Sequence, residues 1–418
     1  MHNKSYRILA QNQMICNNTW VTGINNNDII IGPSGAGKTR GYVKPNLLQC
    51  NESFIVADTK GNLIRQVGPV LEEQGYKIIN IDFTDMGNGY GYNPLDFVRY
   101  DEPYDKYSEQ DIMTIAHTLV PIENGKDPFW DNAAKMYMAC MISYVLECLP
   151  KEELTLEYVA RLIQEMGNGN FGCLIEILAE ENPKSFAVKK YRTFSTTRTA
   201  EKMHASICGI LAEKLDPLTY DSSIKMYSRE KRIDFKQLGR EKTAVFLTIS
   251  DTDRSMDKLV NLFYTQALHT LCKSADKDYE DNRLPIPVRI ILDDFATNAY
   301  IPEFDKIISV IRSREIYVSI ILQSLTQLED LYGHAKAMTI VNNCDNLLYL
   351  GGQDIETAEF IGVKMDKPTT MILNLPLDEA YLFTRGQKPQ KVKKFDITTH
   401  EKYALLPEAQ AVQFSACS

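Results

Sequence analysis

A glycine-rich stretch near the amino end places the strongest constraint on the fold. Residues 29–48 read IIIGPSGAGKTRGYVKPNLL, in which three isoleucines lead into a glycine turn, a lysine, a hydroxyl residue and a helix-like segment. The residues from Gly32 to Thr39 match the pattern G-x-x-x-x-G-K-[ST] in full. In this pattern the glycines let the backbone wrap closely, so that several N–H groups at a helix N-terminus face a polyphosphate. We therefore predict a P-loop, also called a Walker A motif, between a buried strand and a helix.

The motif implies roles for two residues of the predicted loop, with ATP and Mg²⁺ as the expected ligands. Lys38 is expected to reach the outer phosphates, and Thr39 is expected to place its hydroxyl on the metal ion. The alternative is a glycine turn that ends in a lysine by chance. The residues expected to surround the nucleotide are Gly32, Pro33, Ser34, Gly35, Ala36, Gly37, Lys38, Thr39 and Arg40.

A pair of acids far along the chain supplies the second half of a Walker-type site. The stretch VRIILDDF, residues 288–295, reads as a buried strand that ends in Asp293 and Asp294. A P-loop ATPase needs such a carboxylate to hold the metal, so Asp293 is the predicted Walker B acid. Asp294 is the predicted general base for the attacking water. Taken alone, paired acids after a strand more often cap the next helix.

A third apolar strand, IYVSIILQS at 316–324, ends in Gln323. A neutral hydrogen-bonding group at this place could sense the terminal phosphate or the attacking water. On its own a glutamine after a strand is a common turn residue.

The order of patterns predicts an α/β fold with a mainly parallel sheet that a helical segment interrupts. Short β-branched runs alternate with helices up to residue 98, helix-like periodicity fills 99–228, and strand-like runs return in 229–404. We therefore expect a nucleotide-binding domain in two parts, 1–98 and 229–404, around an all-α insertion at 99–228. The last residues, 405–418, lack periodicity and are predicted to be disordered.

Composition and charge exclude some classes of protein. The chain has 418 residues, of which 44% are hydrophobic and 24% charged, and its nine cysteines include no CxxC pair. This favours a cytosolic globular protein with reduced thiols. The longest apolar run, residues 136–146, is shorter than the roughly 20 residues that a membrane span needs. A net charge of −9 argues against a wholly basic surface but still permits a local basic channel for DNA.

Several stretches resemble one family, the TraG-like coupling proteins of type IV secretion, which are conjugative DNA-transfer ATPases. The similarity covers about residues 28–400 in the order of the family. It is carried by VADTKGNL after the second strand, YNPL at 92–95, residues 293–333, GGQDIETAEFIG at 351–362 and LFTRGQKP at 382–389.

The resemblance implies a RecA-like P-loop motor domain with an all-helical insertion. By the same likeness, Lys38 and Thr39 are the P-loop pair, Asp293 holds the metal and Gln323 senses the phosphate. Asp58 and Lys60, within ADTKG, would lie near the nucleotide without an assigned role. The implied protein forms a ring, expected to be a hexamer, at the cytoplasmic face of the membrane. Its implied partners are DNA, expected to be single-stranded, relaxase and relaxosome proteins, and inner-membrane channel proteins.

Two departures from the family bear on these expectations. The family usually has Asp-Glu where this chain has Asp293-Asp294, so slow turnover is expected because the shorter side chain holds the water less well. Typical members also begin with membrane helices, which this sequence lacks. The chain would then either rely on partners for attachment or be an incomplete copy.

Ring ATPases commonly complete each site with an arginine from the next subunit. Arg314 and Arg385 rank first here, although each is more often a surface or ion-pair residue. A basic cluster near the carboxyl end could supply phosphate contacts for DNA, or could simply be a solvated strand edge. The members of this cluster are Arg385, Lys388, Lys391, Lys393 and Lys394.

Two rival functions remain open at this point. The first is a double-stranded DNA pump of the FtsK or HerA kind, which shares the motor but lacks the helical insertion. The second is a nucleotide-bound docking scaffold, in which Asp294 leaves hydrolysis negligible and the insertion binds a relaxosome protein.

Overall fold

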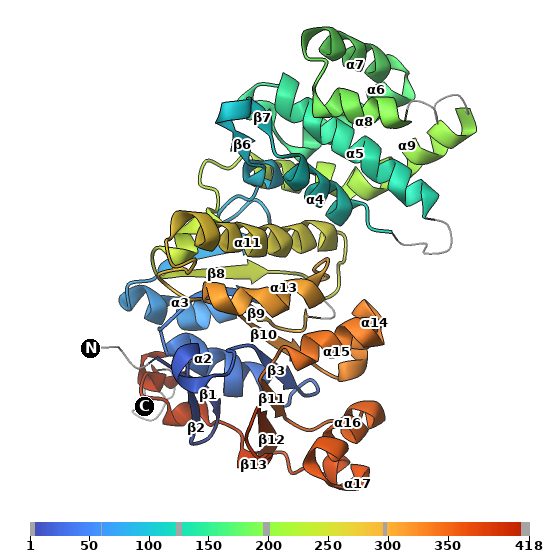
Figure 1. Cartoon of the computed structure of the whole chain (residues 1–418). Coiled ribbons are helices and arrows are strands. Elements are labelled where there is room, and N and C mark those ends of the chain that lie inside the picture. The colour runs from blue at the N-terminus through green and yellow to red at the C-terminus, as the bar shows by residue number, and fades with distance from the viewer. Residues whose placement is uncertain (1–4, 60, 123–127, 195–200, 296–298, 411–418) are drawn as a thin grey trace. The chain divides into compact units, whose positions relative to one another are not determined.

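A computed structural model describes residues 5–59, 61–122, 128–194, 201–295 and 299–410 (Figure 1). The contacts divide the chain into two compact units. Unit 1 consists of residues 1–84, 234–252 and 268–418, and unit 2 consists of residues 85–233 and 253–267. The division falls at 84/85 and 233/234, whereas the sequence patterns placed the insertion at 99–228. It also assigns residues 253–267 to unit 2.

A nine-stranded sheet, in the part of the chain that the structure describes, forms the centre of unit 1. Its order is β13-β12-β11-β3-β10-β9-β4-β8-β5, and every neighbouring pair from β11 to β5 is parallel. The last two strands, β12 and β13, add to the β11 edge in antiparallel orientation. The strands are β3 (Asp28–Ile31), β4 (Ser53–Ala57), β5 (Lys77–Asp82), β8 (Thr243–Thr248), β9 (Val288–Leu292), β10 (Ile316–Leu322), β11 (Asn346–Tyr349), β12 (Glu379–Thr384) and β13 (Gln390–Lys393).

Most of the strands are buried along their whole length, as their continuous β-branched runs predicted. Each residue of β3, β4, β8, β9, β10 and β11 is buried. The helices that accompany this sheet are α2 (Lys44–Leu48), α3 (Leu63–Glu73), α13 (Phe304–Val310), α14 (Leu325–Tyr332), α15 (His334–Asn342), α16 (Ile355–Met365) and α17 (Thr369–Leu373). Helix α11 (Asp257–Asp278) begins in the residues of unit 2 and ends in those of unit 1.

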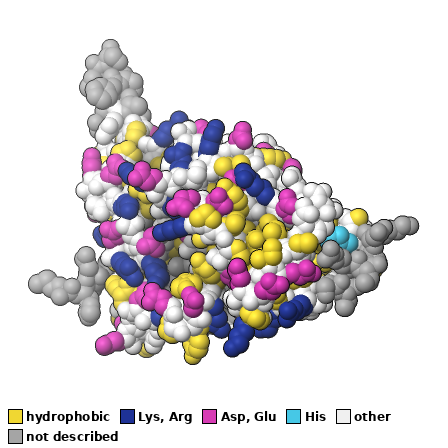
Figure 2. Space-filling model, turned by 90° about the horizontal axis from the view of Figure 1, so that it is seen from above, with side chains coloured by type: hydrophobic (Ala, Val, Ile, Leu, Met, Phe, Trp, Pro, Cys, Tyr) yellow, Lys and Arg dark blue, Asp and Glu magenta, His cyan; other side chains and the backbone are white. Residues whose placement is uncertain are grey.

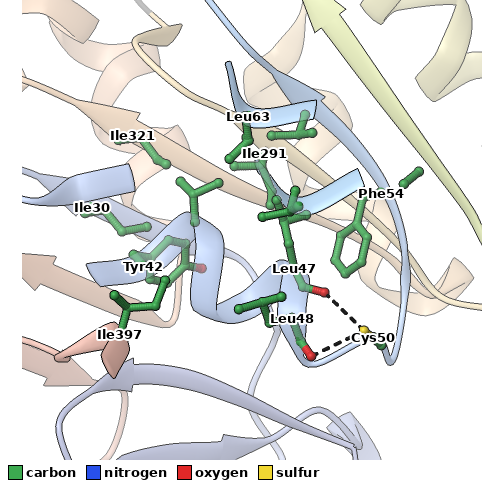
Figure 3. Close-up of a cluster of buried hydrophobic side chains, with 14 of the residues drawn as sticks. Ile30, Tyr42, Leu47, Leu48, Cys50, Phe54, Leu63, Ile291, Ile321 and Ile397 are labelled. Atoms are coloured by element: carbon green, nitrogen blue, oxygen red, sulfur yellow. Dashed lines mark hydrogen bonds between the residues drawn. The ribbon is translucent and has the colours of Figure 1, made fainter. Parts of the chain in front are cut away.

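One face of the sheet is covered by α2, α3 and the turn before α2, which pack their apolar side chains on it (Figure 3). Leu47 and Leu48 from α2 and Leu63 from α3 lie in one cluster with Ile291 of β9 and Ile321 of β10. Because these side chains are less than 5% exposed, we expect each to stabilise the fold by about 1.5–3 kcal/mol. This core holds the P-loop strand and the acid-bearing strand in fixed register.

A short hairpin precedes the sheet and was not predicted. Strands β1 (Tyr6–Ala10) and β2 (Gln13–Cys16) pair antiparallel, and α1 (Thr19–Thr22) follows them. Asn46 of α2 ties the hairpin down, because its side chain accepts from the Ile8 N–H at 2.9 Å and donates to the Ile8 carbonyl at 2.8 Å.

Unit 2 is mainly helical, in agreement with the periodicity of the sequence. In α6, for example, the buried residues Leu156, Val159, Leu162, Ile163 and Met166 follow the spacing of one helix face. The helices are α4 (Glu109–Leu119), α5 (Phe129–Cys148), α6 (Leu156–Gly167), α7 (Asn170–Glu181), α8 (Phe186–Phe194), α9 (Glu201–Leu215) and α10 (Asp221–Tyr227). The unit also contains a two-stranded ladder, β6 (Tyr100–Asp101) with β7 (Lys106–Tyr107), so the expectation of an all-α insertion missed these strands.

Of the tail predicted to be disordered, 405–418, residues 411–418 lie outside the described residues. For residues 405–410 the prediction is wrong, because Leu406 is fully buried in the hydrophobic cluster of unit 1. Among the residues that are described, no helix combines the length and the hydrophobicity required to cross a bilayer.

Candidate functional site

The glycine-rich turn leaves the carboxyl end of β3 and adopts a conformation that requires glycine. Gly35 and Gly37 have φ angles of 77° and 90°, in the left-handed region where a Cβ is unfavourable. A larger residue is unfavourable at position 32 for another reason, because a Cβ on Gly32 would lie 2.9 Å from Cβ of Leu350. The backbone conformation thus favours glycine at positions 35 and 37, and close packing against Leu350 favours it at position 32.

Lys38 folds back over this loop and is almost completely buried. Its Nζ donates to the carbonyl of Gly32 at 2.8 Å and lies 3.6 Å from Oδ1 of Asp294. The side chain is only 8% exposed. Its ammonium group is therefore held over the mouth of the loop, next to the second acid of the predicted pair.

The structure brings the P-loop together with the two acids predicted from the distant strand. The Thr39 hydroxyl donates to Oδ2 of Asp293 at 3.2 Å, although the two residues are 254 positions apart. This contact arises because β10 lies between β3 and β9, and the three parallel strands present their carboxyl ends at one edge. The same edge is where ligands bind in open α/β sheets.

The two acids differ in their environment. The pKa of Asp293 is raised from 3.8 to about 6, first by burial and second by the neighbouring Asp294 carboxylate, while Lys38 and the Thr39 hydrogen bond oppose the shift. Asp294 has 33% of its side chain exposed, and its backbone has a φ of 48°. A non-glycine residue held in the left-handed region is a strained feature of the kind that clusters at functional sites.

These residues form the wall of a pocket of about 380 Å³. Its lining includes Arg40 and every other predicted loop residue except Gly32, together with both acids. Besides Asp58, five further lining residues were not predicted: Ala57, Thr59, Asn62, Leu63 and Gln66. Ala57 is the last residue of β4, which is the neighbour of β9, and the other four follow it, so only the order of strands could have identified them.

Asp58, whose role the sequence left open, caps a helix in the pocket wall. Its carboxylate accepts the backbone N–H groups of Asn62, Leu63 and Ile64 at 3.1, 2.7 and 3.1 Å. These are the free donors at the start of α3, which explains why an acid is suited to this place. Lys60, which shares the motif, lies outside the described residues.

Gln323 lies next to the loop but is not among the residues that line the pocket. It follows Leu322, which pairs with Ile31, and the Gly32 N–H donates to the Leu322 carbonyl at 3.0 Å. The backbone N–H of Gln323 donates to Oε1 of Gln327 at 3.1 Å. Its proposed sensing role therefore stays a prediction.

Arg314 and Arg385 lie at the opposite edge of the sheet, near the amino ends of the parallel strands. Arg314 precedes β10 and forms a two-pronged ion pair with Asp276, at 2.7 and 2.9 Å. Arg385 follows β12 and contacts Asp345 at 3.1 Å and the Gly23 carbonyl at 2.7 Å. Neither arginine faces the pocket of its own chain, so their predicted role requires a second chain.

The basic cluster near the carboxyl end is divided among different contacts. Lys391 pairs with Glu379 across the β12–β13 ladder, and Lys393 lies 3.8 Å from Asp378. Lys394 instead donates to the carbonyl of Ala36 in the P-loop at 3.1 Å. These ion pairs favour the interpretation that Lys391 and Lys393 belong to a solvated strand edge.

The donor set fits a small divalent cation. Two oxygen ligands at adjacent corners of an octahedron with bonds of about 2.1 Å lie roughly 3 Å apart. The Thr39 hydroxyl and the Asp293 carboxylate are 3.2 Å apart, so a metal ion could bind both oxygens directly, or bind Asp293 through a water. A bound cation would also favour the ionised form of a carboxylate whose pKa burial has raised.

Comparison with known proteins identifies the family. The model of the family described as type IV secretory system conjugative DNA transfer matches residues 3–372. Protein VirD4 of Rhizobium rhizogenes is 23% identical over 360 residues, which is 85% of this chain and 51% of VirD4. The conjugal transfer protein TraG of Escherichia coli is 24% identical over 364 residues, which cover 81% of this chain and 54% of TraG. The chain thus spans about half the length of these relatives.

Solved structures share the fold at low sequence identity. The plasmid coupling protein TrwB in complex with ADP and Mg²⁺ superposes with a TM-score of 0.65 at 17% identity, covering 88% of this chain and 85% of that one. VirB4 of Thermoanaerobacter pseudethanolicus superposes with a TM-score of 0.54 at 14% identity, covering 94% of this chain and 97% of that one. The predicted fold class, a RecA-like α/β domain with a mainly parallel sheet, is confirmed. The chain belongs to the type IV secretory system conjugative DNA transfer family.

Proposed function

We propose that the protein is a Mg²⁺-dependent ATPase that couples ATP hydrolysis to the transfer of DNA through a type IV secretion channel. The observation that carries this proposal is the contact between Thr39 and Asp293, which joins the two halves of a Walker site. Membership of the DNA-transfer family supports the same assignment. The TrwB structures with ADP and Mg²⁺ and with an ATP analogue, which share this fold, also support it.

In the proposed reaction, the loop N–H groups and Lys38 bind the phosphates and compensate the charge that develops on the transferred phosphoryl group. Binding of the phosphates would draw Lys38 away from the Gly32 carbonyl that it contacts without ligand. The metal ion, held by Thr39 and Asp293, would neutralise charge on the phosphate oxygens. A water would attack the γ-phosphorus and give its proton to Asp294, the bond from this phosphorus to the bridging oxygen would break, and ADP and inorganic phosphate would leave.

Asp294 would act as the general base, because it is adjacent to the metal-holding acid and is partly open to solvent. Gln323 would orient the water or sense the phosphate from the end of β10. Arg314 and Arg385 would act on the site of a neighbouring subunit in a homo-oligomeric ring, which we propose to be a hexamer. Their position at the sheet edge away from the pocket supports action between chains rather than within one.

We propose DNA, single-stranded in the transfer reaction, as the substrate of this motor. Figure 2 shows lysine and arginine side chains interspersed with acidic ones on the face of the molecule seen from above. Since a contact surface for the DNA backbone needs concentrated positive charge, we place the DNA contact elsewhere, in the channel of the assembled ring. Unit 2 would bind relaxase or relaxosome proteins. The inner-membrane channel proteins would then bind the ring at the cytoplasmic face of the membrane.

The test is ATP turnover by the purified chain with and without DNA, in parallel with the variant Lys38→Ala. Stimulation by single-stranded DNA, lost in the variant, is the expected result. Stimulation by double-stranded DNA alone would favour the FtsK- or HerA-like pump. Nucleotide binding without any turnover would favour the docking scaffold, since the short Asp294 side chain is the feature that distinguishes that alternative.

A further inference from the structure

The helical segment after the P-loop lysine contains one irregular turn. Residues Thr39–Val43 form a π-helical turn, in which the Lys44 N–H donates to the Thr39 carbonyl, five residues earlier. A regular α-helix with 3.6 residues per turn begins only at Lys44. The turn therefore inserts one extra residue between the P-loop and α2.

Pro45 gives a local reason for this irregularity. Proline has no N–H, and in a continuous α-helix its ring would clash with the carbonyl four residues earlier, here that of Gly41. Widening the preceding turn relieves the clash. Nδ2 of Asn46 donates to the carbonyl of Tyr42 at 2.8 Å, so a side chain of α2 is hydrogen-bonded to the backbone of the widened turn.

The extra residue changes the direction in which the residues before the turn point, relative to α2. One residue of an α-helix turns the chain by about 100°, so everything before the widened turn is rotated by that amount relative to α2. Thr39 is the first residue of this turn. The direction of its hydroxyl, toward Asp293, therefore depends on whether the turn stays π-helical.

Tyr42 anchors the turn from the inside of the fold. Its side chain points from the turn into the buried cluster near Ile30, and it is 1% exposed (Figure 3). The hydroxyl donates to Oδ2 of Asp28 at 2.5 Å and lies 2.8 Å from Oγ of Ser319. Because its one proton goes to Asp28, Ser319 is the donor in the second bond.

The two anchor residues are fixed in their own right. Ser319 and Asp28 are register partners on β10 and β3. Asp28 also accepts from Arg7 at 3.0 Å and from Asn346 at 2.9 Å, and Ser319 accepts from Arg289 at 3.0 Å. Tyr42 thus ties the widened turn to a buried network at the amino end of β3, about 13 Å along the chain from Gly32.

We infer that Tyr42 is a positioning residue for metal binding. Through the π-helical turn it holds the Thr39 hydroxyl in the orientation that lets this residue and Asp293 bind one Mg²⁺ ion. The inference rests on the proposed function, because it assumes that the pocket takes Mg²⁺ with a nucleotide. It deepens that proposal by assigning a role to a residue that does not line the pocket.

The test compares Tyr42→Phe with Tyr76→Phe. Tyr76 is also a buried tyrosine whose hydroxyl makes a protein hydrogen bond, to the Glu52 carbonyl at 2.7 Å, but it lies outside the turn. For each variant, binding of a fluorescent ADP analogue is measured without metal and then as a function of Mg²⁺ concentration. Thermal melting shows that each variant is folded.

Tyr42→Phe is expected to raise the Mg²⁺ concentration at half-saturation about 5- to 10-fold while the metal-free affinity for ADP stays within about twofold, since an orienting contact typically accounts for about tenfold in metal affinity. Tyr76→Phe should change neither quantity. The inference is overturned if Tyr42→Phe and Tyr76→Phe have the same Mg²⁺ concentration at half-saturation. It is also overturned if Tyr42→Phe lowers the metal-free affinity for ADP by the same factor by which it raises the Mg²⁺ half-saturation. If the unaltered protein binds no nucleotide, the proposed function fails instead.

A second variant keeps the inference testable if Tyr42→Phe does not fold. Ser319→Ala removes one of the two partners of the Tyr42 hydroxyl and leaves Asp28 with its arginine and asparagine contacts. A shift of the Mg²⁺ half-saturation in the same direction, of about two- to threefold, is expected. No shift in Ser319→Ala would refute the role of the anchor.

Discussion

Replacing Asp293 by asparagine should make the ligand-free protein more stable while removing its response to metal. Burial is the main cause that raises the pKa of this carboxyl from 3.8 to about 6, so the ionised group is disfavoured by the fold at neutral pH. Each pKa unit corresponds to about 1.4 kcal/mol, so a shift of roughly two units disfavours the charged form by about 3 kcal/mol. Asparagine has the same shape without the charge. Asp293→Asn is therefore expected to stabilise the ligand-free fold by up to about 3 kcal/mol at pH 7.5.

The pH dependence follows from the direction of the shift. Because the folded-state pKa is raised, the protonated carboxyl of Asp293 contributes stability that is fully present below pH 3.8 and is lost as the pH rises through about 6. Asparagine resembles the protonated form at every pH. The difference between the variant and the unaltered protein should therefore be largest above pH 6 and should vanish as the pH falls from 6 toward 4.

The assay is urea or thermal unfolding between pH 4 and 8, without ligand and with saturating Mg²⁺ and ATP. Ligand at about 100 times its dissociation constant should stabilise the unaltered protein by roughly 2.7 kcal/mol, and the variant should lose most of this gain. A variant that is no more stable at pH 7.5, or whose advantage persists unchanged at pH 4, would refute the reasoning.

Asp58→Asn, in the same pocket wall, is a control for which the opposite change in the free energy of unfolding is expected. Asp58 accepts three backbone N–H groups at the start of α3, so its carboxylate caps this helix. Its replacement by asparagine should destabilise the protein by about 1 kcal/mol, because one acceptor oxygen and the charge at a helix N-terminus are lost. A stabilising effect at both aspartates would indicate a general effect of net charge instead.

Three further changes test other parts of the site. Asp294→Glu should increase ATP turnover severalfold in a steady-state assay, and should lower stability slightly because glutamate tolerates the left-handed backbone, φ 48°, less well than aspartate. Gly32→Ala should destabilise the protein by about 1–3 kcal/mol in urea unfolding, since its Cβ would lie 2.9 Å from the nearest side-chain carbon. The matched change Gly68→Ala, where the nearest atom is 3.6 Å away, should be neutral or stabilising. Arg314→Ala should leave the affinity for nucleotide unchanged but abolish ATP turnover. Mixing Arg314→Ala chains with Lys38→Ala chains should restore part of the turnover, because some mixed interfaces then contain an intact lysine and an intact arginine. No recovery on mixing would contradict action between chains.

The strands, the glycine turn and the predicted pair of acids could be recognised from the sequence because each depends on local chemistry. The three isoleucines of β3 are β-branched, and the strand was found buried along its whole length. Gly35 and Gly37 occupy left-handed backbone positions that few other residues tolerate, so they are visible as a motif. The helical periodicity of unit 2 was equally visible, whereas the two-residue strands β6 and β7 are too short to give a periodic signal.

The motifs indicated that the P-loop and the two acids share one site, but the sequence alone could not determine which other distant segments meet. The order of strands brings residues 59–66 to the pocket and sends Arg314 and Arg385 to the far edge of the sheet. The same order buries a charge within an otherwise apolar strand. Arg289 of β9 is 1% exposed and reaches Glu52 at 2.6 Å, 237 residues away.

Tyr42 shows the physical reason for this limit most clearly. Its position six residues before the end of a helical segment suggests only an apolar face, and nothing nearby in sequence is a partner for its hydroxyl. The partners, Asp28 and Ser319, are adjacent only because β3 and β10 pair in parallel register. Local patterns determined which segments form strands, helices and a phosphate-binding turn, while the pairing of strands far apart in the chain decided which side chains meet, because hydrogen bonds and ion pairs act only over a few ångströms.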